Sequence, residues 1–261
     1  MSSTYAYSGT NNMRKLRRKR WKRIFCSCLF IILSVLLISL STMIFRGYMG
    51  YKEALTSQSP EDMVARIQKN EDYTSYEDLP SYYLDAVVAI EDHRFYQHNG
   101  FDIWATLRAC RNDIRTLSFK EGGSTITQQL AKNEYFTQDK TLNRKISEIF
   151  MAQELERHFS KEKILELYVN SIYFGNGSYG IGQASKFYFD TPASNLNFNQ
   201  ATLLAGIPNA PAIYALNEHP KLAAQRQRYI IKAMIKYGFL TVEESKNYTL
   251  PEYKTPRYPN N

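Results

Sequence analysis

Two carboxylates directly follow a run of apolar residues in the segment AVVAIEDHRFYQHNG, residues 86–100. Residues 86–90 are all apolar, Glu91 and Asp92 come next, and His98 follows six positions after Asp92. A carboxyl group at the end of a buried run loses part of its hydration, which raises its pKa and suits it to general acid or base catalysis. We therefore take Glu91 as a candidate catalytic residue that Asp92 and His98 could orient. The alternative is a helix end whose charges lie in water.

The segment EGGSTITQQLAKN joins a glycine-rich turn to the start of a predicted helix. Ser124 or Thr125 would cap that helix, and Thr125 with Gln128 fits the capping-box pattern. Thr125, Gln129 and Lys132 then share one helix face. Free backbone N–H groups beside a lysine suit an anion such as phosphate. The alternative is an ordinary capped helix with a solvated polar face.

Arg144 and Glu148 form a third candidate pair, four positions apart on one face of a predicted helix. The alternative is a surface ion pair, which stabilises a helix by about 0.2–0.5 kcal/mol. The four histidines do not have metal-ligand spacing, and the sequence contains neither a Walker loop nor a serine nucleophile elbow. We therefore expect no structural zinc and assign no metal ligands.

Basic residues are concentrated near the start of the chain. Residues 14–23 contain eight Lys or Arg, and no Asp or Glu occurs before Glu53. The 33 basic residues less these eight leave 25, which equals the 25 acidic residues, so the remaining chain is formally neutral. A nucleic-acid-binding domain would spread its basic residues over a folded face. We therefore do not expect nucleic acid as a partner.

An uncharged run, IFCSCLFIILSVLLISLSTMIF, occupies residues 24–45. It is long enough to cross a hydrocarbon core of about 30 Å as a helix. Basic residues before a span favour a cytoplasmic N-terminus. We therefore predict a single-pass cell-membrane protein with its folded domain on the extracytoplasmic face. A cleaved signal peptide is the alternative, although no A-x-A site follows the run.

Helical periodicity dominates from residue 81 onward, and strand alternation is scarce, which predicts one mainly α-helical domain. Cys110 is the only cysteine in this part of the chain, so the domain has no internal disulfide. The predicted segments are a basic cytoplasmic tail at 1–23 (disordered over 1–13), a transmembrane helix at 24–45, a connector at 46–74 with a helix at 60–69, the folded domain at 75–250 and a tail at 251–261. The predicted helices of the folded domain cover 81–92, 102–116, 125–133, 141–158, 161–171, 178–188, 197–206 and 220–236.

Five segments, in order, resemble the signatures of the family 51 glycosyltransferases, the transglycosylase domain of class A penicillin-binding proteins. EDHRFYQHNGFD resembles the first signature, E-D-x-x-F-x-x-H-x-G, and GGSTITQQLAKN the second. RKISE, KEKILELYVNSIYFGNGSYGIGQAS and NQATLLAGIPNAPAIYAL are similar to the third, fourth and fifth. The resemblance covers roughly residues 75–235. Because no transpeptidase follows before Asn261, we expect a monofunctional peptidoglycan glycosyltransferase.

The resemblance implies a mainly α fold with a lysozyme-like large lobe and a smaller membrane-proximal jaw lobe, preceded by one transmembrane helix. The implied reaction polymerises lipid II, a disaccharide-pentapeptide on undecaprenyl pyrophosphate, into linear glycan strands by inverting transfer. Glu91 matches the base that deprotonates the acceptor's 4-hydroxyl. Glu148 matches a second glutamate that helps the pyrophosphate leave. No tightly bound cofactor is implied, and a divalent cation (Mg²⁺ or Mn²⁺) could assist.

The resemblance also implies a set of substrate-binding side chains in the same cleft. Lys132 and Arg144 match residues near the phosphates. The chain departs from the family at Glu134, where Leu is usual, and at Gln200, where Glu is usual, but neither position is matched to catalysis. The substrate-binding residues are Asp92, His98, Ser124, Thr125, Gln128, Gln129, Lys132, Asn133 and Arg144.

Two other functions fit parts of the pattern. A lytic transglycosylase would cleave the same glycan with one acid and would need no phosphate site. A catalytically silent scaffold would hold other cell-wall synthesis proteins, which are also candidate partners of the polymerase. The expected partners are lipid II, the growing glycan strand and the bilayer.

Residues 101–119 lie where the family places its jaw, and they carry more large apolar side chains than one helix face needs for packing. We therefore expect a second membrane contact there, with Arg108, Arg111 and Arg115 facing anionic head groups. The alternative is ordinary core packing with solvated arginines.

Overall fold

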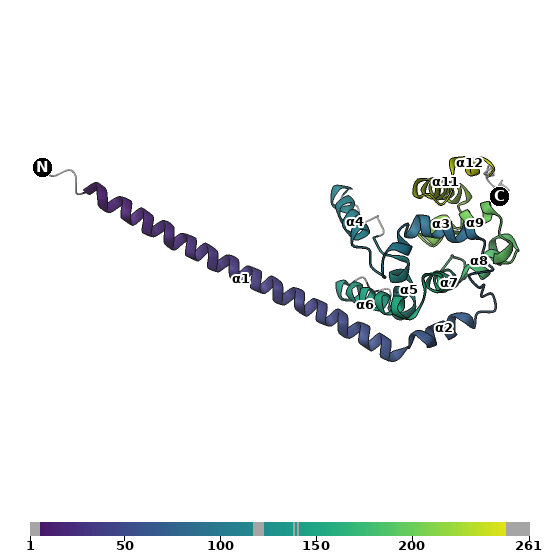
Figure 1. The fold of residues 1–261 in the computed structure, drawn as a ribbon, viewed down its shortest axis with the longest axis horizontal. Helices are drawn as coiled ribbons and strands as arrows, with labels where there is room; N and C mark the ends of the chain where they lie inside the picture. Colours follow the sequence, from purple (N-terminus) through teal and green to yellow (C-terminus); the bar gives the residue numbers. More distant parts are fainter. Residues whose placement is uncertain (1–5, 117–122, 138, 140, 249–261) are drawn as a thin grey trace, which may run out of the picture.

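Helices make up nearly all the regular structure in the computed structural model of the chain (Figure 1). The structure describes residues 6–116, 123–137, 139 and 141–248. Within these ranges no β-strand is present, and an isolated antiparallel bridge joins Tyr173 to Tyr179. The predicted mainly α fold, preceded by one long apolar helix, is confirmed.

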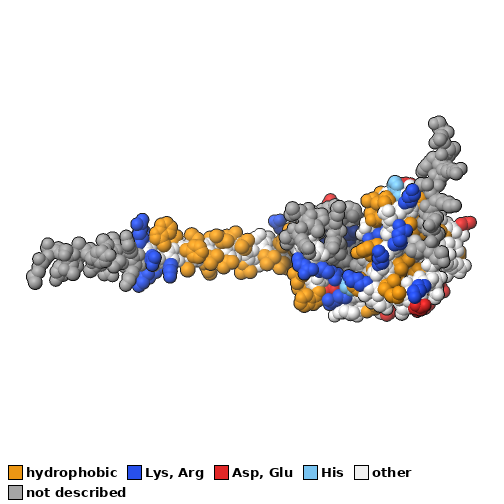
Figure 2. Space-filling model, turned by 90° about the horizontal axis from the view of Figure 1, so that it is seen from above, with side chains coloured by type: hydrophobic (Ala, Val, Ile, Leu, Met, Phe, Trp, Pro, Cys, Tyr) orange, Lys and Arg blue, Asp and Glu red, His pale blue; other side chains and the backbone are white. Residues whose placement is uncertain are grey.

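The first helix, α1 (Ala6–Ser57), contains the predicted span. Its described part from Arg17 onward is long and apolar enough to cross a membrane, and none of its most apolar stretch is buried by the rest of the chain. Figure 2 shows apolar side chains along this helix after a cluster of Lys and Arg. The prediction of disorder is wrong for residues 6–13, and the helix also continues through 46–57, because no proline interrupts the chain before Pro60.

The end of α1 packs along α6 (Leu142–His158). Gly47 is buried there, and a Cβ at this position would come within 2.4 Å of Ile146 Cγ2. The Ser147 hydroxyl donates to the Gly47 carbonyl oxygen over 2.7 Å. The long helix is therefore joined to the folded domain by close packing.

The central helix of the folded domain is α3 (Ser81–Glu91), which packs against α9 (Phe198–Leu204) and α11 (Pro220–Tyr237). Most of its residues are buried, as expected of a helix that is apolar on nearly every side. Beside it, α5 (Ile126–Tyr135) packs against α6 and α7 (Lys161–Ser171). Glu91 therefore stands at the point where a buried helix ends.

The remaining elements agree with most of the predicted boundaries. The helix expected from residue 178 begins at Ile181, because residues 172–180 form a loop that ends at Gly180 with φ +84°. In Figure 1, α4 stands at the edge of the domain. The other helices are α2 (Pro60–Gln68), α4 (Ile103–Thr116), α8 (Ile181–Phe189), α10 (Pro211–Tyr214), α12 (Val242–Lys246), η1 (Phe95–Gln97) and η2 (Ala193–Asn195).

Candidate active site

Glu91 is the last residue of α3. One oxygen of its carboxylate accepts a hydrogen bond, and the other accepts none from the described residues. The Gln129 side-chain amide donates to Glu91 Oε2 over 2.8 Å. Oε1 is buried and has no hydrogen-bond partner among the described residues. Burial raises the pKa of Glu91, and the hydrogen bond from Gln129 opposes that rise. The carboxylate therefore has a free acceptor oxygen and an elevated affinity for a proton.

Gln129 is held in turn by Tyr168 of α7. The Tyr168 hydroxyl donates to Gln129 Oε1 over 3.1 Å, which leaves the Gln129 NH₂ group to face Glu91. Burial raises the pKa of Tyr168 well above its ordinary value, so the phenol keeps its proton and remains a donor. These two hydrogen bonds fix the orientation of the Glu91 carboxylate.

Asp92 and His98 orient the start of α5 and do not bond to Glu91. Asp92 Oδ2 accepts from the backbone N–H of Ile126 over 3.1 Å and lies 2.9 Å from His98 Nε2. Because Ile126 is the first residue of α5, this carboxylate sits at the positive end of the helix dipole. The two residues predicted to orient Glu91 therefore act on the neighbouring helix that carries Gln129.

The predicted capping box of α5 is confirmed. Thr125 is the N-cap, its hydroxyl accepts from the Gln128 N–H over 3.1 Å, and Gln128 Oε1 accepts from the Thr125 N–H over 3.0 Å. The Thr125 hydroxyl also donates to the Gly100 carbonyl oxygen over 2.7 Å. The Thr125 hydroxyl therefore uses both its donor and an acceptor position within the fold. Gln128 keeps a buried NH₂ group without a partner among the described residues.

Two cationic side chains form ion pairs with the buried Glu148 carboxylate, and the charge of Glu148 also acts on a third, Lys132. Arg144 Nη1 lies 3.1 Å from Glu148 Oε1, and Lys145 Nζ lies 2.9 Å from Oε2. Lys145 Nζ also donates to the Ser124 hydroxyl over 2.6 Å. Burial lowers the pKa of Lys132, and the Glu148 carboxylate opposes that change. We call Lys132, Arg144, Lys145 and Glu148 the cation cluster.

A cavity of about 550 Å³, the glutamate cavity, reaches from Glu91 to Lys132 and Glu148 of the cation cluster, while Arg144 and Lys145 do not line it. Both predicted catalytic glutamates line it, as do Ser124, Gln128, Gln129 and Lys132. Positive side chains from other helices also line it, namely Arg108 of α4 and both Arg226 and Lys236 of α11. The Arg226 guanidinium and the Lys132 ammonium both lower the pKa of Glu91 against the effect of its burial.

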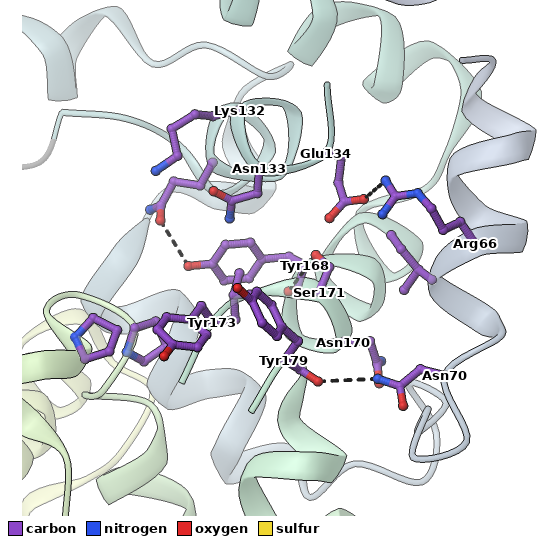
Figure 3. A pocket seen from close by; sticks show the side chains of 15 residues that line it. Arg66, Asn70, Lys132, Asn133, Glu134, Tyr168, Asn170, Ser171, Tyr173 and Tyr179 are labelled. Carbon is purple, nitrogen blue, oxygen red and sulfur yellow. Dashed lines mark hydrogen bonds and ion pairs between the residues drawn. The ribbon is translucent and has the colours of Figure 1, made fainter. Parts of the chain in front are cut away.

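A second cavity of about 590 Å³, the tyrosine cavity, adjoins the first and shares Gln129, Lys132 and Pro208 with it. Figure 3 shows the tyrosine rings that line it together with Lys132 and Asn133. Asn133, which was predicted to bind substrate, lies here and does not line the glutamate cavity.

Four cationic residues of the site were missed by sequence reasoning: Arg108, Lys145, Arg226 and Lys236. Lys145 lies three positions before Glu148, a spacing that brings side chains together on a helix. Arg108 was assigned to a membrane-facing surface, yet it lines the glutamate cavity. Arg226 reaches the cavity from α11, and no local pattern relates it to Glu91.

The side chains around Glu148 do not form a site that would hold a divalent cation by protein ligands alone. Such a cation binds several oxygen ligands, commonly carboxylates. Glu148 is already paired with Arg144 and Lys145, and the described residues contain no group of three His, Cys, Asp or Glu side chains that could hold a metal. The residues here are suited to an anion.

Known proteins resemble this chain over most of its length. A sequence model described as Transglycosylase matches residues 60–235. Penicillin-binding protein 1F of Bacillus subtilis (strain 168) is 36% identical over 235 residues, which are 86% of this chain and 33% of that protein. Penicillin-binding protein 1A of Aquifex aeolicus (strain VF5) is 42% identical over 189 residues, 71% of this chain and 26% of that protein. Penicillin-binding protein 1A of Neisseria lactamica is 40% identical over 195 residues, 74% of this chain and 24% of that protein.

The matched region contains α3, α5 and α6, the helices that carry Glu91, Lys132 and Glu148. The chain therefore belongs to the transglycosylase family, and the predicted resemblance is confirmed. The chain spans about a third or less of the length of these curated relatives.

Proposed function

We propose that this chain polymerises lipid II into linear glycan strands by inverting transfer and releases undecaprenyl pyrophosphate. The observation that carries the proposal is that one cavity is lined by a buried carboxylate with a free oxygen, by Lys132 and Glu148 of the cation cluster, and by Arg108 and Arg226. A hydroxyl nucleophile needs such a base, and a pyrophosphate leaving group needs such cations.

In the proposed reaction Glu91 Oε1 accepts the proton of the 4-hydroxyl of the acceptor's N-acetylglucosamine. The oxygen then forms a bond to the anomeric carbon of the donor's N-acetylmuramic acid. The bond from that carbon to the pyrophosphate oxygen breaks, and the electron pair leaves with the pyrophosphate. Attack from the face opposite the leaving group inverts the configuration from α to β.

The cation cluster stabilises the negative charge that develops on the leaving pyrophosphate. Lys132 Nζ makes no ion pair with any described residue, so it is free to bind a phosphate oxygen. Arg144 and Lys145 are held in place by Glu148, which is the role that we propose for this second glutamate.

The lipid chain of the substrate requires an enzyme at the bilayer, and α1 is the candidate anchor. The eight basic residues before the apolar run support a cytoplasmic N-terminus and an extracytoplasmic folded domain. A reporter that is active only outside the cytoplasm should work when it is fused after Asn261. If a reporter that is active only in the cytoplasm works at the same position, the predicted orientation is wrong.

The test of the function is incubation of the purified full chain with lipid II, followed by separation of the products by gel electrophoresis. Polymerisation predicts a ladder of glycan strands. A lytic transglycosylase would make no strands and would cleave preformed glycan, and a silent scaffold would do neither.

A further inference from the structure

A further cavity of about 520 Å³, the juxtamembrane cavity, lies between the end of α1, the end of α5 and the start of α6. It shares no described lining residue with the glutamate cavity. Its lining residues on α1 begin at Arg46, which directly follows the apolar run 24–45, and continue along one face of the helix to Gly50, Glu53 and Ala54. The cavity therefore begins where the predicted membrane span ends.

The start of α6 lies at the bilayer end of this cavity. A Cβ on Gly47 would meet Ile146, and further along both helices the Tyr51 hydroxyl donates to Glu154 Oε2 over 3.0 Å. Because the residue numbers of these contacts rise together, α1 and α6 run in the same direction. The first turn of α6 is therefore level with the end of the span, at the depth of the phospholipid head groups.

Arg144 in this first turn has a hydrogen-bond donor that no described residue satisfies. Its Nη1 lies 3.1 Å from Glu148 Oε1, but its Nε is buried and has no partner in the described chain. The Nε–H group can only donate, and a buried donor normally has an acceptor. Arg144 lines the juxtamembrane cavity, so an acceptor bound there can supply the missing bond. The N-terminal end of the helix dipole also favours an anionic acceptor at this place.

A second cation of the cavity is available to the same anion. Arg46 is exposed and makes no ion pair with any described residue. Its guanidinium presents several N–H donors in a geometry that matches phosphate oxygens. Two arginines, one directly after the span and one in the first turn of α6, therefore favour a phosphate group at the bilayer surface.

The same cavity also has acidic side chains that favour a positive group. Glu53 and Asp139 line it, both are exposed, and neither forms an ion pair within the described residues. Glu134, the remaining acidic residue of the wall, is paired with Arg66. Glu53 is seven residues after Arg46, about 10 Å along α1. A head group that carries both a phosphate and an ammonium complements this arrangement, whereas a purely anionic ligand does not.

We propose that the juxtamembrane cavity binds the head group of phosphatidylethanolamine, a phospholipid with a phosphate and a primary ammonium. The phosphate accepts from Arg46 and from Arg144 Nε, and the ammonium donates to the Glu53 carboxylate. The acyl chains remain in the bilayer beside α1. A primary ammonium has three N–H donors, which the trimethylated head group of phosphatidylcholine lacks. Phosphatidylglycerol has the phosphate but no positive group.

This site goes beyond the proposed reaction, although Arg144 connects the two. The guanidinium that binds the phosphate also pairs with Glu148, which lines the glutamate cavity. A bound phospholipid therefore holds one member of the cation cluster in place from outside that cavity. The test of the site does not need lipid II, so loss of phospholipid binding and loss of polymerisation are separate outcomes.

The experiment titrates the purified full chain in detergent with each of the three phospholipids, all with the same acyl chains, and measures bound lipid by native mass spectrometry. We expect the wild type to bind phosphatidylethanolamine about tenfold more tightly than either other lipid. Arg46→Met should weaken phosphatidylethanolamine binding about tenfold. Glu53→Gln should abolish the preference for phosphatidylethanolamine over phosphatidylglycerol. Lys52→Met and Glu61→Gln, which change exposed charges outside the cavity, should match the wild type.

The proposal is overturned if the wild type binds phosphatidylethanolamine no more tightly than it binds either other lipid. Unchanged binding in both cavity variants, or an equal loss in the control variants, would also overturn it and would leave the cavity to another occupant. Arg46 and Glu53 are exposed, so neither substitution removes a core contact. If one of the two variants unfolds at a lower temperature than the wild type, the other decides alone by the same criterion.

Discussion

At the scale of single residues, the two largest influences on the pKa of Glu91 oppose each other. Burial raises its pKa, and the hydrogen bond from Gln129 lowers it. Since the base must be ionised to accept a proton, activity should fall as the pH drops through this raised pKa. The acid limb of the pH–rate profile therefore reports the environment of Glu91.

Gln129→Leu should move that acid limb to higher pH, because the variant removes the bond that favours the ionised carboxylate. The measurement is the initial rate of lipid II consumption across the pH range. Tyr168→Phe is the matched control: it removes the bond between Tyr168 and Gln129 but leaves the bond to Glu91, so its acid limb should move less. An unchanged limb in Gln129→Leu would show that this bond does not control the base.

Lys132→Ala and Arg144→Ala should each lower kcat/KM for lipid II roughly ten- to a hundredfold, since hydrogen bonds to charged groups are worth about 1.5–3 kcal/mol. Both side chains belong to the cation cluster, and Lys132 also lines the cavity that holds Glu91. Lys246→Ala, which removes a mostly exposed lysine paired with Glu243, serves as the charge control. Wild-type kinetics in both cluster variants would show that the cation cluster takes no part in the reaction.

At the scale of elements, two glycines on one face let α1 lie close to α6. A Cβ on Gly47 would meet Ile146, and one on Gly50 would come within 2.8 Å of Ser147 Oγ. Alanine is normally about 1 kcal/mol better than glycine inside a helix. At a close helix contact the strain, about 1–3 kcal/mol, should outweigh that gain.

Gly47→Ala should therefore loosen the packing of α1 on α6 even though it raises helix propensity. Hydrogen–deuterium exchange should become faster in residues 46–57 of the variant. Met49→Ala changes an exposed side chain on the same turn and should leave exchange unchanged. Slower or equal exchange in Gly47→Ala would mean that this contact does not hold the two helices together.

Local patterns predicted the helices and the cap of α5, because Thr125 and Gln128 are three positions apart and their bonds depend on that spacing alone. The same reasoning could not predict that Asn70 holds the loop of Tyr179, since the two residues are 109 positions apart. Arg226 likewise reaches Glu91 only because α11 packs on α3. Contacts between distant segments depend on packing, which periodicity does not encode.

At the scale of the whole molecule, α4 exposes an apolar surface that bears on membrane attachment. Ile103, Trp104 and Leu107 are 55%, 63% and 55% exposed, so the described part of this helix is not packed into the core there. Phe119 of the predicted jaw segment lies outside the described residues. Arg108, predicted to face lipid head groups, lines the glutamate cavity.

We predict that the apolar surface of α4 enters the bilayer interface. A chain that lacks residues 1–45, and so keeps Gly47 for packing on α6, should still sediment with anionic vesicles. Trp104→Ser combined with Leu107→Ser should reduce sedimentation, whereas Ile213→Ser, which changes an exposed residue of α10, should not. No sedimentation of the shortened chain, or no effect of the double variant, would leave α1 as the anchor.

The central claim is that Glu91 is the base of a glycan polymerase, and Glu91→Gln tests it most directly. The amide fills nearly the same space but cannot accept the proton. A raised pKa in the folded state means that ionisation of Glu91 destabilises the fold at neutral pH, so the variant should unfold at a temperature no lower than the wild type. Glu162→Gln on the surface of α7 is the control.

The deciding measurement is the rate at which the two purified variants convert lipid II into strands at neutral pH. We predict that the rate of Glu91→Gln is about 10²- to 10⁴-fold lower than that of the wild type and that the rate of Glu162→Gln is unchanged. A folded Glu91→Gln protein that polymerises lipid II at close to the wild-type rate would contradict the assignment of Glu91 as the base.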